Sequence, residues 1–299
     1  MSHRSRQMAG LSVKAGSELI VVTEVRILDR AARLRSDRDA RAGALILLLV
    51  AMTACVGTVR AAAAFTVGHR GQTFDVYRLA SGEEQRLRFF WKRDDGTPYG
   101  SIAALETALA ERGEQLVFAL NGGIYSKAFE PLGLYIEGGR TYHELNTKDG
   151  GGNFFLKPNG VFYVTPAGAA VVTTEAYAPQ RQVSNAVQSG PMLVSRGRLH
   201  PRFIPGYHSK HVRNGVGVDP QGRVVFAISN NPVNFHDFGT LFRDRLQCPN
   251  ALYLDGKIAA LYAPVLKRFA TWSWRPFVTM MGMTVPLPPE GTGVDAGAL

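Results

Sequence analysis

The stretch Leu116-Val117-Phe118-Ala119-Leu120-Asn121-Gly122-Gly123 joins an apolar, strand-like run to a short polar turn. Two later stretches repeat this arrangement, Ala186-Val187-Gln188-Ser189-Gly190-Pro191 and Ala251-Leu252-Tyr253-Leu254-Asp255-Gly256. Glycine lets the backbone turn sharply, and strand ends are where loops converge on ligands. Each motif alone is also an ordinary turn sequence, because Asn-Gly and Asp-Gly are common turn dipeptides.

Short β-type runs separated by glycine and proline dominate the chain after Phe65. Alternation and turn residues predict strands at 73–79, 87–91, 115–120 and 251–254, and hairpins at 133–139, 153–164, 193–200 and 215–229. Helical spacing predicts one helix that begins after Ser101 and ends at Gly113, and another over about 234–247. This content indicates an α+β fold: a strand-rich mixed sheet with a few packed helices, in a single domain with a cleft at the strand ends.

The region before Phe65 has the layout of a secretory signal. A compact apolar stretch at 44–52 follows Arg38 and Arg41, and Ala61-Ala62-Ala63-Ala64 is the favoured cleavage site. Cys55 in a weak lipoprotein-type box is the competing site. A retained anchor is the less favoured alternative, because the apolar stretch is shorter than the roughly 20 residues that cross a bilayer.

We therefore divide the chain into a leader with a signal peptide at 1–64, a domain at 65–285 and a flexible tail at 286–299. The expected location is exported, in the periplasm or outside the cell. Membrane contact is expected only through the leader or a lipidated Cys55.

The net charge of the chain indicates which classes of partner it can bind. The whole chain has a net charge of +10, but the part from Phe65 onward has only +5. No basic run with interleaved aromatic residues is present, which argues against a nucleic-acid partner. A modest positive excess suits an anionic sugar phosphate or a negatively charged glycan.

Candidate chemistry centres on one arginine and one carboxylate. Arg213 is predicted to grip a phosphate in bidentate fashion, and Asp255 is the carboxylate best placed beside an anomeric carbon, ahead of Glu144 and Asp219. A surface or ion-paired arginine is the equally weighted alternative for Arg213, and a turn residue is favoured for Asp219. The expected substrate-binding residues are Asn121, Gly122, Gly123, Gln188, Ser189, Gly190, Glu144 and Asn230, with backbone amides of the glycine turns forming an anion nest.

No metal motif with defined ligand spacing appears. His200, His208 and His211 lie close together, but on a proline-containing loop. We expect no cofactor and assign no metal ligands, and the sequence leaves a divalent metal open.

Six motifs in their order along the chain resemble the phosphodiester glycosidase family. They are Asn121-Gly122-Gly123, Pro131-Leu132-Gly133-Leu134, Gly152-Asn153-Phe154-Phe155, Gln188-Ser189-Gly190-Pro191-Met192-Leu193, Arg213-Asn214-Gly215-Val216-Gly217 and Leu252-Tyr253-Leu254-Asp255-Gly256.

The resemblance implies a mixed α and β domain with a cleft over the strand ends, and hydrolysis of a sugar 1-phosphodiester. The residues that it places in the cleft are Asn121, Gly123, Gln188, Ser189, Gly190, Arg213 and Asp255. One departure stands out, because Lys257-Ile258-Ala259-Ala260 follows Asp255-Gly256 where a glycine-rich stretch is expected.

The resulting hypothesis is an exported hydrolase that cleaves the bond between an anomeric carbon and a phosphate oxygen. Arg213 and the glycine-turn amides would hold the phosphate, and Asp255 would activate water or stabilise the oxocarbenium charge. The rival hypothesis is a non-catalytic envelope module that binds phosphorylated glycan. A metal-dependent phosphodiesterase that cuts the P–O bond is a third alternative.

Overall fold

The computed structural model describes residues 62–179, 182–271 and 273–288, all of which belong to one compact unit, 59–299. The predicted leader lies outside these residues except for 62–64, as do Cys55 and most of the tail at 286–299. Strand β1 (Ala63–His69) begins two residues before the predicted cleavage point. In the described part of the chain, no helix has the length and apolar character needed to cross a membrane.

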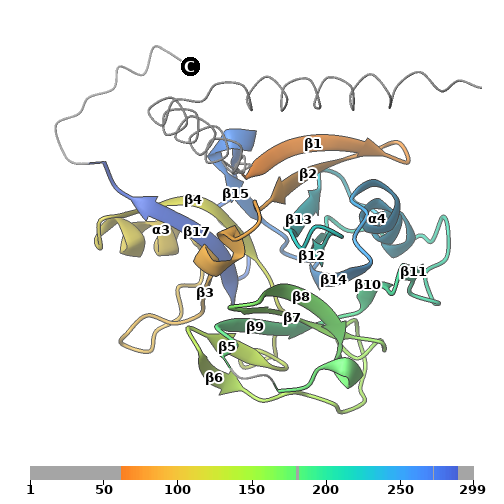
Figure 1. Ribbon diagram of the computed structural model, residues 1–299, viewed down its shortest axis with the longest axis horizontal. Helices are drawn as coiled ribbons and strands as arrows, with labels where there is room; N and C mark the ends of the chain where they lie inside the picture. Colours follow the sequence, from red (N-terminus) through yellow and green to blue (C-terminus); the bar gives the residue numbers. More distant parts are fainter. Residues whose placement is uncertain (1–61, 180–181, 272, 289–299) are drawn as a thin grey trace, which may run out of the picture. The chain divides into compact units, whose positions relative to one another are not determined.

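The strands form three sheets (Figure 1). The largest contains, in spatial order, β1, β2 (Gln72–Arg78), β13 (Val224–Ser229), β12 (Asn214–Val218), β14 (Asn250–Asp255), β10 (Met192–Ser195) and β11 (Arg198–Leu199). The second contains β16 (Arg268–Phe269), β15 (Leu261–Ala263), β4 (Glu114–Asn121), β17 (Met280–Pro286) and β3 (Arg88–Phe90). The third contains β6 (Arg140–His143), β5 (Tyr135–Glu137), β9 (Asn185–Ser189), β7 (Gly160–Thr165) and β8 (Gly168–Thr173).

The strand-rich α+β class is confirmed. The strands are divided among three sheets rather than gathered in one, and every ladder between the named strands is antiparallel.

The main core lies where the inner faces of the three sheets meet. Phe226 from the first sheet packs on Phe118 from the second and on Phe162 from the third, with ring centroids 5.1 and 6.1 Å apart. Alternate residues of the same strands face outward, as Val161 and Tyr163 do in β7, and they join separate clusters. Both faces of each sheet are therefore apolar, which explains the nearly continuous hydrophobic runs in the sequence.

Two α-helices cover outer faces in the described part of the chain. Helix α3 (Ile102–Ala110) packs beside β4, and the predicted cap is confirmed because the Ser101 hydroxyl accepts from the Ala104 N–H at 3.0 Å. Helix α4 (Phe235–Thr240) is capped by Asn234 and continues as a π-helical turn, Leu241–Arg245, against the first sheet. Short 3-10 turns occur at Glu83–Arg86, Thr174–Ala176 and Pro264–Leu266.

One predicted hairpin is wrong. Residues 153–157 form turns rather than a strand, and β7 pairs instead with β8 and β9. The Asn159 side chain donates to the Phe154 carbonyl at 2.9 Å, and Phe154 is buried, so tertiary packing holds this segment in a compact loop.

Candidate functional site

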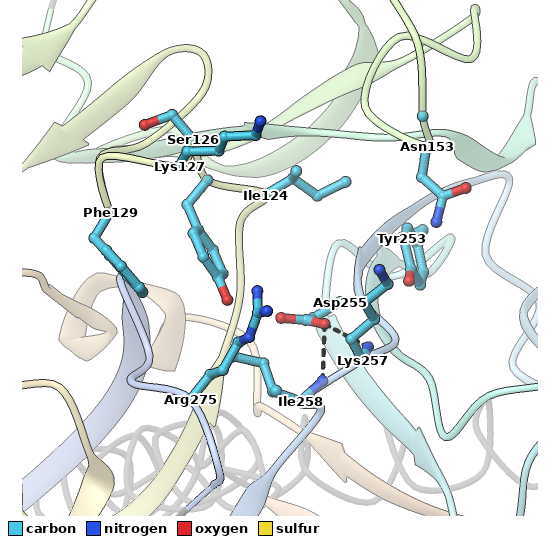
Figure 2. A pocket seen from close by; sticks show the side chains of 12 residues that line it. Ile124, Ser126, Lys127, Phe129, Asn153, Tyr253, Asp255, Lys257, Ile258 and Arg275 are labelled. Atoms are coloured by element: carbon cyan, nitrogen blue, oxygen red, sulfur yellow. Dashed lines mark hydrogen bonds between the residues drawn. The ribbon is translucent and has the colours of Figure 1, made fainter.

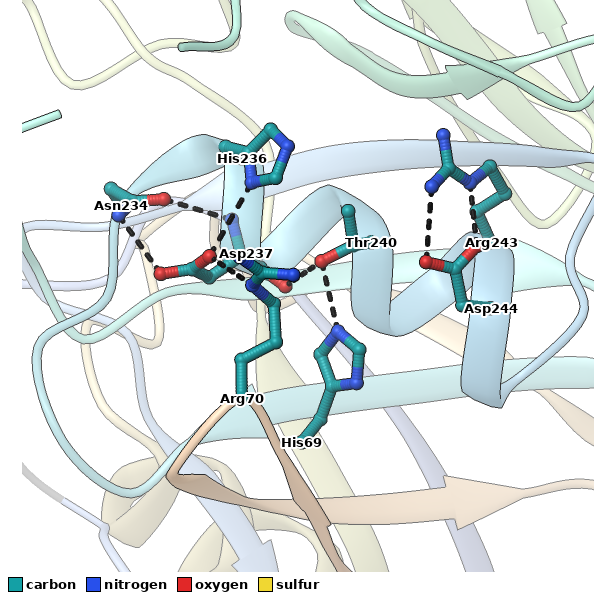
Figure 3. A network of polar contacts seen from close by, with 8 residues as sticks. All are labelled: His69, Arg70, Asn234, His236, Asp237, Thr240, Arg243 and Asp244. Atoms are coloured by element: carbon teal, nitrogen blue, oxygen red, sulfur yellow. Dashed lines mark hydrogen bonds and ion pairs between the residues drawn. The ribbon is translucent and has the colours of Figure 1, made fainter. Parts of the chain in front are cut away.

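A pocket of about 780 Å³ opens beyond the ends of β4 and β14 (Figure 2). Its walls come from the loop after β4, a glycine-rich loop before β7, the end of β14 with the following turn, and the loop before β17. The lining residues are Ile124, Tyr125, Ser126, Lys127, Phe129, Gly152, Asn153, Tyr253, Asp255, Lys257, Ile258 and Arg275. The expected cleft at strand ends is thus present.

Asp255 is the last residue of β14 and has one carboxylate oxygen fixed by the backbone. Oδ1 accepts from the N–H groups of Gly256, Lys257 and Ile258 at 2.5, 2.8 and 3.3 Å. Oδ2 accepts from Asn121 Nδ2 at 3.1 Å and retains lone-pair capacity for one more partner. The side chain is held in one orientation with Oδ2 available to a ligand.

The Asn121 side chain at the end of β4 hydrogen-bonds to the ends of β14 and β12 next to this carboxylate. Its Oδ1 accepts from the Ala260 N–H at 2.7 Å and from Asn214 Nδ2 at 3.0 Å, while its Nδ2 bonds Asp255. The residue is 2% exposed and does not line the pocket. Asn121 therefore orients Asp255, whereas the sequence predicts that it binds the substrate directly.

Burial raises the pKa of Asp255 above its ordinary value, because desolvation outweighs the four hydrogen bonds that favour the carboxylate. A base with a raised pKa is better matched to proton transfer near neutral pH than an ordinary aspartate.

Three cations share the pocket with this carboxylate: Lys127, Lys257 and Arg275. None of them forms a salt bridge with another residue in the described part of the chain. Figure 2 shows the Arg275 guanidinium and the Asp255 carboxylate projecting toward the same space. The pocket therefore has an excess of positive charge suited to an anionic group.

Comparison with known proteins assigns the family. The sequence profile of the phosphodiester glycosidases matches residues 114–281, more than half of the chain. The chain belongs to the phosphodiester glycosidase family. The uncharacterized protein YigE of Escherichia coli (strain K12) is 39% identical over 202 residues, which cover 67% of this chain and 78% of that protein.

A solved relative has the same fold. The catalytic domain of zebrafish N-acetylglucosamine-1-phosphodiester alpha-N-acetylglucosaminidase, auto-inhibited by its pro-peptide, aligns with a TM-score of 0.53 at 14% identity. The alignment covers 77% of this chain and 84% of that chain. At this identity the likeness concerns the fold alone.

Arg213 lies behind the pocket rather than in its lining. It is 1% exposed, its Nε donates to the Val233 carbonyl at 2.9 Å and its Nη2 to the Ser209 carbonyl at 3.2 Å. The guanidinium carbon lies 3.7 Å from the centre of the Phe235 ring. The predicted bidentate grip on a phosphate does not fit this geometry, because two of the three nitrogens already bond carbonyls.

The second strand-end motif is also internal. Gln188 Oε1 accepts from the N–H groups of Leu134 and Asn146, and Nε2 donates to the Asn146 carbonyl and to Thr174 Oγ1. Ser189 is fully buried, with Oγ donating to the Leu254 carbonyl at 3.4 Å, and Gly190 packs against Asn159. The motif is therefore structural: its side chains bond neighbouring loops and strands and do not line the pocket.

The remaining sequence candidates lie outside the lining. The Gly122 N–H donates to the Thr279 carbonyl at 3.1 Å, and Gly123, with φ of 97°, packs against Thr279 and Val187. The N–H of Gly122 is therefore not available for an anion nest. Glu144 is exposed and is not a lining residue, and Asn230 bonds Thr73 and Arg268.

Of the three carboxylates that the sequence offered as catalytic candidates, only Asp255 lines the pocket. Asp219 accepts from the Gln221 and Arg223 N–H groups and pairs with the Arg223 side chain, which confirms that it is a turn residue. His200 bonds the Lys157 carbonyl and the Arg202 N–H. Over the described ranges, no three His, Cys, Asp or Glu side chains come together in a way that could hold a metal ion.

Asp255 is the only one of the twelve lining residues that sequence reasoning assigned to the site. The residues that it missed include Tyr125, Lys127, Asn153, Tyr253, Lys257 and Arg275. Tyr253 had a usable signal, because it precedes Asp255 by two positions and alternate strand residues face the same side. The other five lie on loops, where no periodicity indicates which side chains converge.

Proposed function

We propose that this chain hydrolyses a glycosyl phosphodiester at the bond between the anomeric carbon and the phosphate oxygen. The observation that carries the proposal is Asp255, a carboxylate with one oxygen anchored by three backbone N–H groups and the other open to a pocket rich in cations. Membership of the phosphodiester glycosidase family supports the same reaction class.

The pocket residues have two proposed roles, binding of the phosphate by cations and acceptance of a proton by the carboxylate. Lys257, Arg275 and Lys127 would hold the phosphate, which is already a good leaving group. Asp255 would accept a proton from the attacking water or stabilise the oxocarbenium-like charge at the anomeric carbon. The raised pKa of Asp255 supports the role of base.

We further propose that the substrate is a phosphorylated glycan of the cell envelope, and that the protein acts after export. The positive excess of the domain and the signal-like sequence before Phe65 support this location. Cell fractionation with an antibody against the chain tests it: periplasmic or extracellular protein is expected, and a purely cytoplasmic pool would refute export.

Turnover of defined diesters tests the activity. The purified chain is incubated with α-glycosyl methyl phosphodiesters, including that of N-acetylglucosamine because the solved relative is named for this sugar. Release of reducing sugar is expected. In Asp255→Asn we expect kcat/KM to fall at least about 100-fold, as for loss of a catalytic base.

Asp219→Asn is the matched control, because Asp219 is a buried aspartate that also accepts backbone N–H groups but lies in a distant turn. Equal turnover by Asp255→Asn and wild type would remove the assigned role. If no diester reacts, yet methyl phosphate binds at micromolar, salt-sensitive affinity, the binding-module hypothesis is supported instead.

A further inference from the structure

The Tyr253 hydroxyl lies directly beneath the turn that follows the candidate base. Tyr253 lines the pocket and is 3% exposed. Its hydroxyl is the nearest atom to the position that a Cβ on Gly256 would occupy, and Arg213 Nη1 lies 3.3 Å from the same point. The phenol, the buried guanidinium and the Asp255-Gly256 turn therefore form one group of contacts.

Two hydrogen-bond donors face the phenol oxygen. The guanidinium of Arg213 can only donate, and the Asn153 side chain bonds Tyr253. Figure 2 shows the amide nitrogen of Asn153 on the side toward Tyr253. Both neighbours lower the pKa of the phenol, as donors to its oxygen do. Burial and the charge of Asp255 raise this pKa by more than the two donors lower it, so the hydroxyl keeps its proton.

Among the described residues, the Tyr253 hydroxyl has hydrogen-bond partners that donate to it and none that accepts its proton. Neither a guanidinium nor an amide N–H can accept it, and no other residue among those described accepts from Tyr253. Arg213 Nη1, fully buried, also has no hydrogen bond of regular geometry within the described ranges. Because Tyr253 lines the pocket, a ligand bound there can accept the hydroxyl proton.

We propose that Tyr253 donates its hydroxyl hydrogen bond to the phosphate of a bound glycosyl phosphodiester, with Arg213 and Asn153 as positioning residues. The inference rests on the proposed function and adds a catalytic residue to it.

In the reaction, a water oxygen bonds to the anomeric carbon and the carbon–oxygen bond to phosphate breaks. The electron pair of that bond passes to the phosphate oxygen, and the proton from water passes to Asp255. Tyr253 keeps its proton throughout, and its hydrogen bond strengthens as negative charge develops on the leaving phosphate.

Tyr253→Phe in the full chain tests the proposal, because the change removes the hydroxyl and retains the ring. We expect kcat/KM for an α-glycosyl methyl phosphodiester to fall about 10- to 100-fold, the usual effect of losing a hydrogen bond to a charged group. The loss should appear more in kcat than in KM. Tyr262→Phe is the matched control, because Tyr262 donates to Glu106 away from the pocket lining.

The leaving group separates a catalytic from a structural role. Methyl phosphate is a more basic leaving group than phenyl phosphate and needs more stabilisation, so Tyr253→Phe should lose more activity on the methyl diester. A structural defect would reduce both substrates equally, and that result would overturn the proposal. Asn153→Ala, a change at an exposed loop position, keeps the hydroxyl and should lose about 3- to 10-fold in kcat by releasing its orientation.

Calorimetric titration with methyl phosphate gives a readout that needs no turnover. Tyr253→Phe should bind it at least about 5-fold more weakly than wild type. If wild type cleaves no diester but this difference is found, the proposed function fails while the donor role of Tyr253 stands. Equal affinity together with equal kcat/KM would overturn the donor role alone.

Discussion

At the scale of single residues, Asp255 combines two opposing demands. A base in a pocket must be desolvated enough for its pKa to rise, yet it must be held in one orientation. Burial supplies the first condition, and three backbone N–H groups with Asn121 supply the second. The same burial makes the ionised form of Asp255 energetically unfavourable in the folded state.

The contribution of Asp255 to the stability of the fold therefore depends on pH in a defined direction. Because the pKa of Asp255 is raised on folding, the folded protein binds this proton more tightly than the unfolded chain does. The stability that it contributes is present below the unfolded pKa, about 3.9, and is lost as pH rises through the raised folded pKa. Urea denaturation of wild type and Asp255→Asn across this range should show the difference in unfolding free energy shifting in favour of the variant as pH rises. A difference that stays flat or moves the other way would contradict the burial argument.

Asn121 is predicted to matter for stability as well as for the site. Asn121→Ala removes the acceptor of the buried Ala260 N–H and the donor to Asp255, so we expect a loss of about 3 kcal/mol in unfolding free energy. Denaturant titration measures this loss. Asn230→Ala is the control, because Asn230 is only partly buried and lies outside the pocket lining, and its loss should be about 1 kcal/mol or less. Equal losses in the two variants would refute the conclusion that Asn121 stabilises the contact between the strand ends.

At the scale of elements, the end of β14 depends on a close approach that only glycine permits. A Cβ at Gly256 would collide with the Tyr253 hydroxyl and crowd Arg213. Gly256→Ala should therefore cost about 1–3 kcal/mol and reduce turnover, as overpacking does.

Gly68→Ala on β1 provides the comparison, since a Cβ there meets nothing within 4 Å. Thermal melts and turnover of the two variants check the contrast. A Gly256→Ala variant as stable and active as Gly68→Ala would show that the turn tolerates a side chain.

Local signals determined which elements could be predicted. The Ser101 cap and the hairpin at 215–229 depend on neighbouring residues, so sequence pattern was enough for both. Residues 153–157 have the composition of a strand, but the contacts of Asn159 and buried Phe154 hold them in turns. β17 was missed because Met-Met-Gly-Met carries weak strand propensity and pairs only through its neighbours β4 and β3.

At the scale of the whole molecule, the site arises where sheets meet. β4 belongs to the second sheet, whereas β12 and β14 belong to the first, and Asn121 joins their ends. The sequence identified Asp255 and Asn121 as strand-end residues. It could not show that Arg213 lies behind Tyr253, because a long side chain can lie on either side of a packed ring until the tertiary structure fixes it.

The position of bond cleavage tests the central claim most directly. An α-glycosyl methyl phosphodiester is hydrolysed by the full chain in heavy-oxygen water, and both products are examined by mass spectrometry. We predict that the label enters the anomeric hydroxyl of the released sugar and that methyl phosphate stays unlabelled. Label in the phosphate would mean that the P–O bond breaks, and it would contradict glycosidic cleavage at Asp255.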